Sequence, residues 1–204
     1  MTSWDDRFRD GNYPQDPDPS PVLHRYIEMF PEGRALDIAT GTGRNAVFLA
    51  EQGYTVDAID QSREGLRIAR QNASQRSVEE NCTWIQADAT EFGYPENEYD
   101  AITISYFRTL DRLPDIKAAL KPNGVLFYQH HLRSTEPADI GPSTDRYRFA
   151  SNELLHACLD LTVLYYEEGT ETVDDRTAAR ALIVARNSTG GKQTYPTLPR
   201  PAEQ

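Results

Sequence analysis

The sequence predicts a doubly wound α/β fold. From residue 34 onward, apolar runs typical of buried strands alternate with stretches of helical periodicity. A glycine-rich turn, Gly41-Thr42-Gly43, separates the first apolar run from the first of these helices, whereas no helix separates the last two runs. Alternation of this kind implies right-handed crossovers. We therefore expect a Rossmann-like, seven-stranded, mostly parallel sheet with helices on both faces and an antiparallel last strand.

Before the sheet we expect an extended segment and one helix. Residues 10–21 contain four prolines among Asp, Gln and Ser, which favour an extended chain. The helix should follow at about residue 22 and end before Pro31 and Gly33. Its apolar face would consist of Val22, Leu23, Tyr26, Ile27 and Phe30.

The remaining elements follow from the same periodicities. The expected strands are 34–39, 54–59, 82–86, 99–105, 125–129, 161–166 and 179–185. The expected helices are 44–52, about 63–76, 110–120 and about 152–159. Ser62 should cap the second of these helices, and Ser151 or Asn152 the last. Lys121-Pro122-Asn123-Gly124 should form a tight turn before the fifth strand, and the last two strands should form a hairpin at the sheet edge.

One domain is expected over residues 1–186, because a chain of 204 residues with 38% hydrophobic residues can bury a substantial core. Residues 132–150 are polar and lack periodicity, so we expect a loop or lid over the substrate side. Residues 187–204 begin Asn-Ser-Thr-Gly-Gly and become rich in proline, which is typical of a flexible tail.

The charge balance bears on partners and location. A net charge of -11 disfavours nucleic acid as a partner, because nucleic-acid binding depends on basic residues that neutralise phosphates. No apolar run could span a membrane and no leader is visible, so we expect a cytoplasmic protein. Only three of the 21 basic residues are lysine, as in proteins of salt-loving organisms; an ordinary acidic protein is the alternative. Cys82 and Cys158 are expected to be buried thiols, and no metal site is expected.

The glycine turn predicts a nucleotide-type ligand. Gly41 and Gly43 let the backbone approach a ligand, and Gly41-x-Gly43-x-x-Ala46 also fits the dinucleotide fingerprint. The strand ends separate the possibilities, because Asp37, Asp60 and Asp88 should surround one crevice. A dinucleotide site uses only the second of these, and carboxylates beside a pyrophosphate are unfavourable. A ligand with ribose, an amine, an ammonium and a sulfonium but no phosphate fits better, which favours S-adenosylmethionine.

From Trp4 to Arg186 the chain resembles the class I S-adenosylmethionine-dependent methyltransferases, and residues 36–43 are similar to their first motif. Ala39 stands where many members have glycine, which we expect to be tolerated because φ stays negative there. The resemblance implies that Asp60 binds the ribose diol, Asp88 and Ala89 the adenine, and Ser105-Tyr106 the methionine end. The implied cofactor residues of the core are Asp37, Ala39, Gly41, Gly43, Asn45, Asp60, Gln61, Asp88, Ala89, Ser105 and Tyr106.

The amino-terminal residues indicate a branch of this class. Trp4-Asp5-x-Arg7-Phe8, Tyr13-Pro14 and Pro19-Ser20-Pro21 resemble the opening of small-molecule methyltransferases of the tellurite-resistance and thiopurine type. This resemblance implies that residues 1–21 form a lid over the cofactor, with Trp4, Arg7 and Tyr13 as lid residues. Alternatively, Trp4 and Phe8 pack an amino-terminal helix onto the sheet.

The acceptor side is less well defined. Tyr106, His130 and His131 are candidate bases, although adjacent residues of a strand point to opposite sides and a structural role for the histidines is equally open. Arg108 follows the fourth strand, and Arg133, Arg146 and Arg148 flank the polar loop. If Arg108, Arg133 and Arg148 converge, the acceptor is anionic; if they are solvated or paired, they say nothing about it.

The expected function is methyl transfer from S-adenosylmethionine to a small-molecule acceptor by in-line displacement, which leaves S-adenosylhomocysteine as product. Such chemistry asks the protein mainly to orient the reactants and exclude water. The alternatives are a catalytically silent S-adenosylmethionine-binding protein and a nicotinamide-dependent oxidoreductase. A monomer and a homodimer are both compatible with the sequence.

Overall fold

The computed structural model describes residues 3–11, 13–135, 138–173 and 175–188, together with Lys192 and Tyr195. Within these residues the strands are β1 (Arg34–Ile38), β2 (Thr55–Asp60), β3 (Cys82–Gln86), β4 (Tyr99–Ser105), β5 (Leu120–His131), β6 (Thr162–Val173) and β7 (Arg176–Arg186). The α-helices are α1 (Trp4–Arg9), α2 (Pro21–Tyr26), α3 (Arg44–Glu51), α4 (Arg63–Gln75), α5 (Leu113–Ala118) and α6 (Glu153–Ala157). Short 3-10 helices cover Ile27–Met29, Glu79–Asn81 and Asp145–Tyr147.

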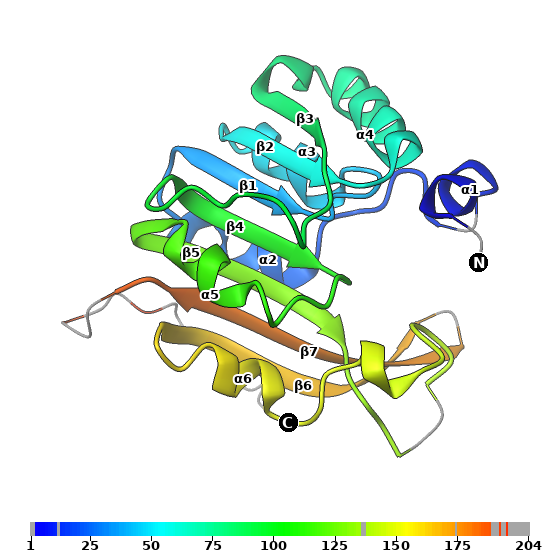
Figure 1. Ribbon diagram of the computed structural model, residues 1–204, viewed down its shortest axis with the longest axis vertical. Helices are drawn as coiled ribbons and strands as arrows, with labels where there is room; N and C mark the ends of the chain where they lie inside the picture. Colours follow the sequence, from blue (N-terminus) through cyan, green and yellow to red (C-terminus); the bar gives the residue numbers. More distant parts are fainter. Residues whose placement is uncertain are drawn as a thin grey trace, which may run out of the picture.

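The strands form one sheet in the order β3-β2-β1-β4-β5-β7-β6 (Figure 1). Strands β1 to β5 pair in parallel, and β7 is antiparallel to both of its neighbours. The strand order reverses beside β1, which pairs with β2 on one side and β4 on the other. The predicted doubly wound, seven-stranded sheet with an antiparallel last strand is confirmed. Ligands of such sheets bind beyond the carboxyl ends of the strands at this reversal.

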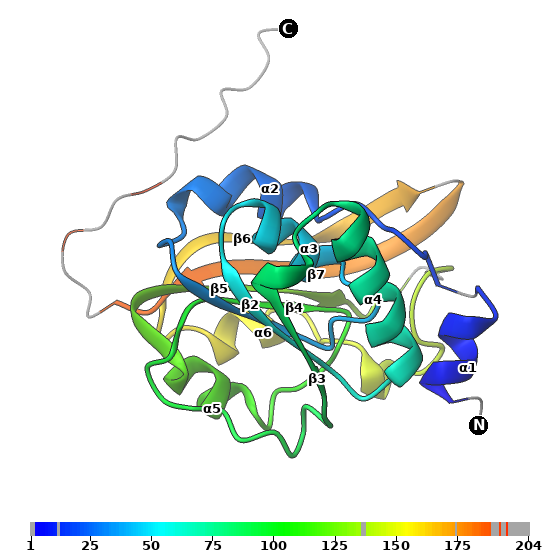
Figure 2. The same ribbon diagram turned by 90° about the horizontal axis from the view of Figure 1, so that it is seen from above.

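Helices cover both faces of the sheet, as predicted (Figure 2). Helices α2 and α3 pack on one face, where the buried side chains include Leu23, Phe48, Leu49, Val56 and Phe127. Helices α5 and α6 pack on the other face, where the buried side chains include Ile102, Ile104, Leu113, Ile116 and Leu154. Burial on both faces explains why the strands have near-continuous apolar runs rather than alternation.

Several predicted boundaries agree with the structure. Strands β3 and β4 have the predicted bounds, and α4 follows its predicted cap, because the Ser62 hydroxyl accepts a hydrogen bond from the Gly65 N–H at 3.0 Å. The predicted helix from residue 22 to 30 is divided into α2 and a 3-10 turn. Helix α6 is shorter than predicted, and Asn152 precedes it in a left-handed conformation without a side-chain cap.

Helix α5 and strand β5 divide the chain differently from the prediction. The helix begins at Leu113 rather than at 110, because Pro114 favours the first turn of a helix. The chain joins the sheet directly afterwards, since Leu120 pairs with Tyr99 before the register shifts. The predicted turn at 121–124 is therefore an irregularity within β5, with Asn123 at φ 68°.

The β6–β7 hairpin is longer than the two predicted apolar runs. Pairing continues from Thr162 opposite Arg186 to Val173 opposite Arg176. The backbone bonds of a ladder do not require apolar side chains, so polar residues such as Glu167 and Glu168 extend the strand. Hydrophobic periodicity detected only the part that lies against the core.

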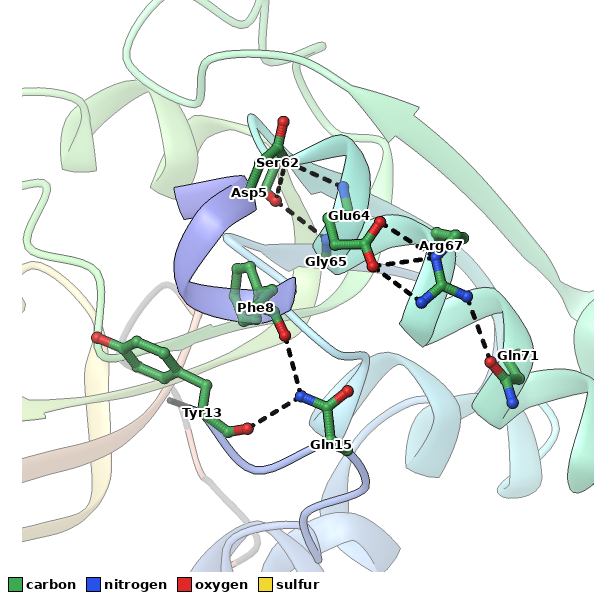
Figure 3. A network of polar contacts seen from close by, with 9 residues as sticks. All are labelled: Asp5, Phe8, Tyr13, Gln15, Ser62, Glu64, Gly65, Arg67 and Gln71. Carbon is green, nitrogen blue, oxygen red and sulfur yellow. Dashed lines mark hydrogen bonds and ion pairs between the residues drawn. The ribbon is translucent and has the colours of Figure 1, made fainter. Parts of the chain in front are cut away.

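The amino-terminal segment begins with helix α1, as the alternative considered from the sequence expected, but this helix packs mainly against α4 rather than the sheet, and Trp4 is 40% exposed. Helix α1 lies against the start of α4 (Figure 3). The Asp5 carboxylate accepts hydrogen bonds from the Ser62 hydroxyl at 2.5 Å and from the Glu64 N–H at 3.0 Å. Phe8 is buried where the glycine turn meets α4. Its ring packs so closely on Gly65 that a Cβ added there would lie 3.1 Å from it.

The segment after α1 is also held in place. Thr42 donates to the carbonyl of Pro14 at 3.1 Å, and Asn72 donates to the carbonyl of Gln15 at 2.7 Å. The Gln15 amide donates in turn to the carbonyls of Phe8 and Tyr13 (Figure 3). The predicted lid segment is thus attached to the glycine turn and to α4.

Residues 132–150 form the expected irregular loop, and its ends are joined. Leu132 forms a parallel bridge with Phe149. The Arg148 side chain donates to the carbonyls of Pro142, Leu132 and Ile140 at 2.8, 3.2 and 3.1 Å. These bonds hold the loop closed on itself; residues 136 and 137 lie outside the described part.

The predicted tail, residues 187–204, lies mostly outside the described residues, which include only 187, 188, 192 and 195 of it. Within the part of the chain that the structure describes, no helix has the length and apolar content needed to cross a bilayer.

Candidate active site

The glycine turn follows β1 at the reversal of strand order. Gly41 and Gly43 have φ of 55° and 89°, and a Cβ on Gly43 would lie 2.9 Å from the Cβ of Ala69. Both conformation and space therefore require glycine at position 43. Ala39 has φ of 56°, so the expectation of a negative φ there was wrong. Ala39 carries the left-handed strain that glycine would avoid, which costs about 1–2 kcal/mol.

Asp37 lies beneath this turn. Its two carboxylate oxygens accept hydrogen bonds from the hydroxyls of Thr40 at 2.5 Å and Thr103 at 2.6 Å. Burial raises the pKa of Asp37 to about 6, while hydrogen bonds from Thr103, Thr40 and Asn45 lower it. These contacts fix the turn to β4 from inside the protein.

Asp60 ends β2 and joins the turn to α4. One carboxylate oxygen accepts the Gly41 N–H at 2.8 Å, and the other accepts the Ser62 N–H at 2.8 Å. Burial raises the pKa of Asp60, and the backbone hydrogen bonds oppose that rise. Gln61 is exposed beside it, and its carbonyl accepts the Gln86 amide at 3.2 Å.

Asp88 follows β3 and is exposed, unlike the other two carboxylates. One of its oxygens accepts the Thr90 hydroxyl at 2.7 Å and the Thr90 N–H at 2.8 Å, and these bonds lower its pKa. The Tyr94 hydroxyl donates to the carbonyl of the buried Ala89 at 2.8 Å. The three carboxylates thus follow three neighbouring strands, as expected, but only Asp88 is exposed to solvent.

Ser105 ends β4 and receives two side-chain amides. Asn45 Nδ2 and Gln129 Nε2 donate to its hydroxyl at 2.9 and 3.0 Å. Among the described residues, Asn45 Oδ1 and Gln129 Oε1 are buried without a hydrogen-bond partner. Gln129 is not among the residues predicted from the sequence, because a single amide within an apolar strand gives no periodic signal.

Tyr106 combines exposure with an unusual backbone. It is 36% exposed and has φ of 60°, a conformation that a bulky residue rarely adopts. Its ring centroid lies 4.8 Å from that of His131, and its hydroxyl accepts a hydrogen bond from Arg180 at 3.2 Å. The Arg44 guanidinium lies 5.7 Å from the centroid of the same ring. Neither arginine was identified from the sequence, because each is distant along the chain from Tyr106.

The two histidines are buried, and burial lowers the pKa of His130 to about 4 and that of His131 to about 3. The Nε2 of His130 lies 2.7 Å from the carbonyl of Tyr147, so this nitrogen carries the proton and donates it. His131 packs against Gly141, where an added Cβ would lie 2.6 Å from its Nδ1. Both rings are neutral at pH 7 and far weaker bases than a free histidine, which favours the structural alternative.

Each of the three candidate substrate arginines has an internal partner. Arg108 pairs with Glu153 at 2.7 Å, and Arg133 donates to the carbonyl of Asp145 at 3.1 Å. Arg148 is buried and donates to the three loop carbonyls. These contacts agree with the alternative considered from the sequence, in which the arginines are paired within the protein.

The amino-terminal candidates lie together on α1 and after it. The rings of Trp4 and Tyr13 are 5.4 Å apart, and the Arg7 guanidinium lies 5.0 Å from the Trp4 ring. Trp4 is 40% exposed.

Two open hollows lie along α4. Residues such as Arg67 and Arg70 line them, and no strand-end residue is part of their lining.

No group of three His, Cys, Asp or Glu side chains arranged for a metal ion occurs among the residues that the structure describes. The strand ends carry carboxylates, amides, hydroxyls and aromatic rings. These groups bind and orient a polar organic ligand through hydrogen bonds and stacking.

Comparison with known proteins adds three findings. Residues 35–124 match the family described as a methyltransferase domain. The chain is 32% identical over 131 residues to the putative methyltransferase YqeM of Bacillus subtilis, covering 59% of this chain and 51% of that protein. It is 33% identical over 128 residues to the ubiquinone/menaquinone biosynthesis C-methyltransferase UbiE of Azotobacter vinelandii, covering 57% and 49%. The chain therefore spans about half the length of these curated relatives.

Among solved structures, TehB from Haemophilus influenzae is similar with a TM-score of 0.72 and 19% identity, covering 90% of this chain and 66% of that one. A methyltransferase from Aquifex aeolicus described as S-adenosylmethionine dependent has a TM-score of 0.63 and 19% identity, covering 92% of this chain and all of that one. At these identities the likeness establishes the shared fold. The residues matched by the family include the glycine turn and the ends of β1 to β4.

Proposed function

We propose that the protein transfers a methyl group from S-adenosylmethionine to a small-molecule acceptor, and the premise of the proposal is that residues 35–124 match the methyltransferase domain family. The observation that carries the proposal is the glycine turn held between Asp37 and Asp60 at the reversal of strand order, with the exposed Asp88 at the next strand end. Residues 1–186 act as one domain in this proposal.

The residues present suit this cofactor. Gly43 leaves no room for a side chain, so the turn packs directly against Ala69 of α4. Asp60 with Gln61 would hold the ribose hydroxyls, and Asp88 with Ala89 the adenine. The turn, Asn45, Ser105 and Tyr106 would hold the methionine end, and Trp4, Arg7 and Tyr13 would close over the cofactor from α1. Three carboxylates at the strand ends suit a cofactor that carries no phosphate and has a cationic sulfonium.

The bound cofactor supplies an electrophilic methyl group, and the protein supplies orientation and exclusion of water. His130 and His131 have pKa values of about 4 and 3, so they accept protons poorly at neutral pH. Tyr106 is the exposed hydroxyl at the strand ends and the remaining candidate for contact with the acceptor. This set of groups favours an acceptor that is already nucleophilic, such as a thiolate.

We propose a small molecule as the acceptor, without carrying over the acceptor of any relative. UbiE is named as a quinone-pathway C-methyltransferase. The family match ends at residue 124, before the part of β5 that carries His131 and before Arg180 on β7. His131 and Arg180, two of the residues beside Tyr106, therefore lie outside the match, whereas Tyr106 and Arg44 lie within it. The net charge of -11 disfavours nucleic acid.

Calorimetry with S-adenosylhomocysteine and with NAD tests the cofactor. We expect the first to bind at micromolar concentration and the second not to bind; binding of NAD alone would support the oxidoreductase alternative instead. Transfer of labelled methyl from S-adenosylmethionine to a panel of thiols, halides, amines and phenols then tests the reaction. Tight binding of S-adenosylhomocysteine with no turnover of any acceptor would support the catalytically silent alternative.

A further inference from the structure

A chain of hydrogen bonds crosses three elements behind the strand ends. The Asn45 side chain on α3 donates to the Ser105 hydroxyl on β4 at 2.9 Å, and it lies near the Asp37 carboxylate on β1, whose pKa it lowers. Gln129 on β5 donates to the same hydroxyl. Asn45 is 2% exposed and Gln129 is fully buried, whereas Ser105 is partly exposed at the end of its strand. The two amides therefore support Ser105 from the interior.

The nearby Asp37 carboxylate favours one orientation of the Asn45 amide. A carboxylate accepts hydrogen bonds and does not donate them, so it favours the amide nitrogen of Asn45, and not the amide oxygen, on its side. The same nitrogen lies 2.9 Å from Ser105 Oγ, which must then accept. Gln129 Nε2 provides a second donor at 3.0 Å. A hydroxyl oxygen has two lone pairs, so both are occupied and only the hydroxyl hydrogen remains free.

This geometry limits what Ser105 can bind. A hydroxyl with both lone pairs occupied can donate to an acceptor and cannot accept from a donor. At the amino-acid end of the proposed cofactor, the ammonium offers only donors and the sulfonium is a cation. The carboxylate is the acceptor at that end, and a hydrogen bond to an ionised group is the strong kind.

We propose that Gln129, together with Asn45, is a positioning residue that makes the Ser105 hydroxyl a hydrogen-bond donor to the carboxylate of the cofactor's amino-acid end. The inference rests on the proposed function, because it requires a ligand of this kind at the strand ends. Gln129 also accepts the Tyr106 N–H on its backbone carbonyl at 3.0 Å, which fixes the direction of the chain after Ser105. That backbone bond survives substitution of the side chain.

Three ligands distinguish this role from a general contribution to packing. S-adenosylhomocysteine carries both the ammonium and the carboxylate, its decarboxylated analogue carries only the ammonium, and methylthioadenosine carries neither. Binding of each is measured by calorimetry to the full-length protein and to Ser105→Ala, Ser105→Thr and Gln129→Met. Gln75→Met, an exposed glutamine at the end of α4, is the matched control.

We expect Ser105→Ala and Gln129→Met to weaken S-adenosylhomocysteine by roughly 10- to 100-fold, the effect of one hydrogen bond to a charged group. Both variants should bind the decarboxylated analogue and methylthioadenosine within about threefold of the unsubstituted protein, since these ligands lack the carboxylate. Ser105→Thr keeps the hydroxyl and should keep the affinity, and Gln75→Met should change nothing.

Equal weakening of all three ligands would overturn the inference and leave Gln129 with a packing role, as would unchanged affinity for S-adenosylhomocysteine. Thermal unfolding without ligand shows whether Gln129→Met is folded. If it is not, the selectivity of Ser105→Ala among the three ligands tests the inference, because Ser105 is partly exposed. If the unsubstituted protein binds none of the three ligands, the proposed function itself fails, which is a different result from loss of selectivity.

Discussion

The ends of β1 to β4 and the region formed by β5, β7 and the loop 132–150 use their polar side chains differently. At the first, carboxylates hold backbone N–H groups of the glycine turn and of α4, as Asp60 does at 2.8 Å to both Gly41 and Ser62. At the second, cationic side chains hold loop carbonyls, as Arg148 does to Pro142, Leu132 and Ile140.

The difference shows how far residue type can indicate function. A carboxylate at the end of a parallel strand lies at the ligand edge whatever it contacts, because the sheet fixes its position. An arginine in an irregular loop finds its partners among the carbonyls that the loop itself leaves unpaired. Arg108, Arg133 and Arg148 accordingly have internal partners, and the cations beside Tyr106 are Arg44 and Arg180.

The largest effect is expected at the glycine turn. Gly43→Ala would place a Cβ 2.9 Å from that of Ala69 at φ 89°, so we expect a loss of about 2–5 kcal/mol in the free energy of unfolding. S-adenosylhomocysteine should bind at least about tenfold more weakly, because the turn must move. Denaturant unfolding and calorimetry measure the two effects.

Gly53→Ala is the matched control. Gly53 has φ of 92° and nothing within 4 Å of an added Cβ, so the substitution carries the conformational strain alone, about 1–2 kcal/mol. Its affinity for S-adenosylhomocysteine should be unchanged. Equal behaviour of the two variants would show that space at the turn does not matter.

The second effect tests the loop. Arg148→Met removes three hydrogen bonds from a buried guanidinium, so we expect a loss of about 2–4 kcal/mol in the free energy of unfolding and no change in cofactor affinity. Arg133 is exposed, and its side chain donates one hydrogen bond to the same loop, so Arg133→Met should lose less than about 1 kcal/mol. A stable Arg148→Met that raises only the KM of an identified acceptor would place Arg148 in the acceptor site.

A third prediction compares two carboxylates of the cofactor region. Burial raises the pKa of Asp37 to about 6 from an ordinary 3.8. Between these two pKa values the native state keeps a proton on Asp37 that the unfolded state has released, so the free energy of unfolding falls as pH rises through this range. The free energy of unfolding, relative to that of Asp37→Asn, should fall by about 2–3 kcal/mol from pH 4 to pH 7.

Asp88→Asn provides the opposite sign. Hydrogen bonds from Thr90 lower the pKa of Asp88, so its contribution to stability is present above the ordinary pKa and is lost as pH falls. Relative to Asp88→Asn, the protein should therefore become slightly more stable as pH rises. Denaturant titrations across this pH range measure both; the same sign for the two residues would contradict the difference in burial.

The smallest effect concerns both regions alike. With a net charge of -11, screening by salt should relieve repulsion between surface carboxylates, so the thermal midpoint should rise by a few degrees from low to molar KCl. Sucrose at the same osmolality controls for stabilisation by excluded solutes. A midpoint that does not rise with KCl would count against the halophilic interpretation and leave an ordinary acidic protein.

The fold was largely predictable from the sequence. Strands β3 and β4 have their predicted bounds, and the seven-stranded sheet and the resemblance to class I methyltransferases are confirmed. Buried strands and amphipathic helices have local periodicities that survive in any context. The errors occur where tertiary pairing extends an element, as in the hairpin that continues to Val173 and Arg176.

The site was predictable only in part. The positions of Asp37, Asp60 and Asp88 follow from the topology, but their surroundings do not, because burial and partners depend on residues far along the chain. Burial raises the pKa of Asp37 while Thr103 and Asn45 oppose that rise, and Arg180 reaches Tyr106 from β7. The φ of 56° at Ala39 was contrary to expectation, since local sequence does not reveal a strain imposed by the turn.

By itself, the sequence determined the order of strands and helices, the glycine turn and the carboxylates at the strand ends, because each depends on residue type and local spacing. Only the tertiary structure decided which polar groups are available to a ligand. It buried Asp37 and left Asp88 exposed, tied Arg148 to loop carbonyls, and placed Gln129 behind Ser105. The physical reason is that a hydrogen bond made inside the fold occupies a donor or a lone pair that a ligand could otherwise use, and the partners that make it come from distant segments.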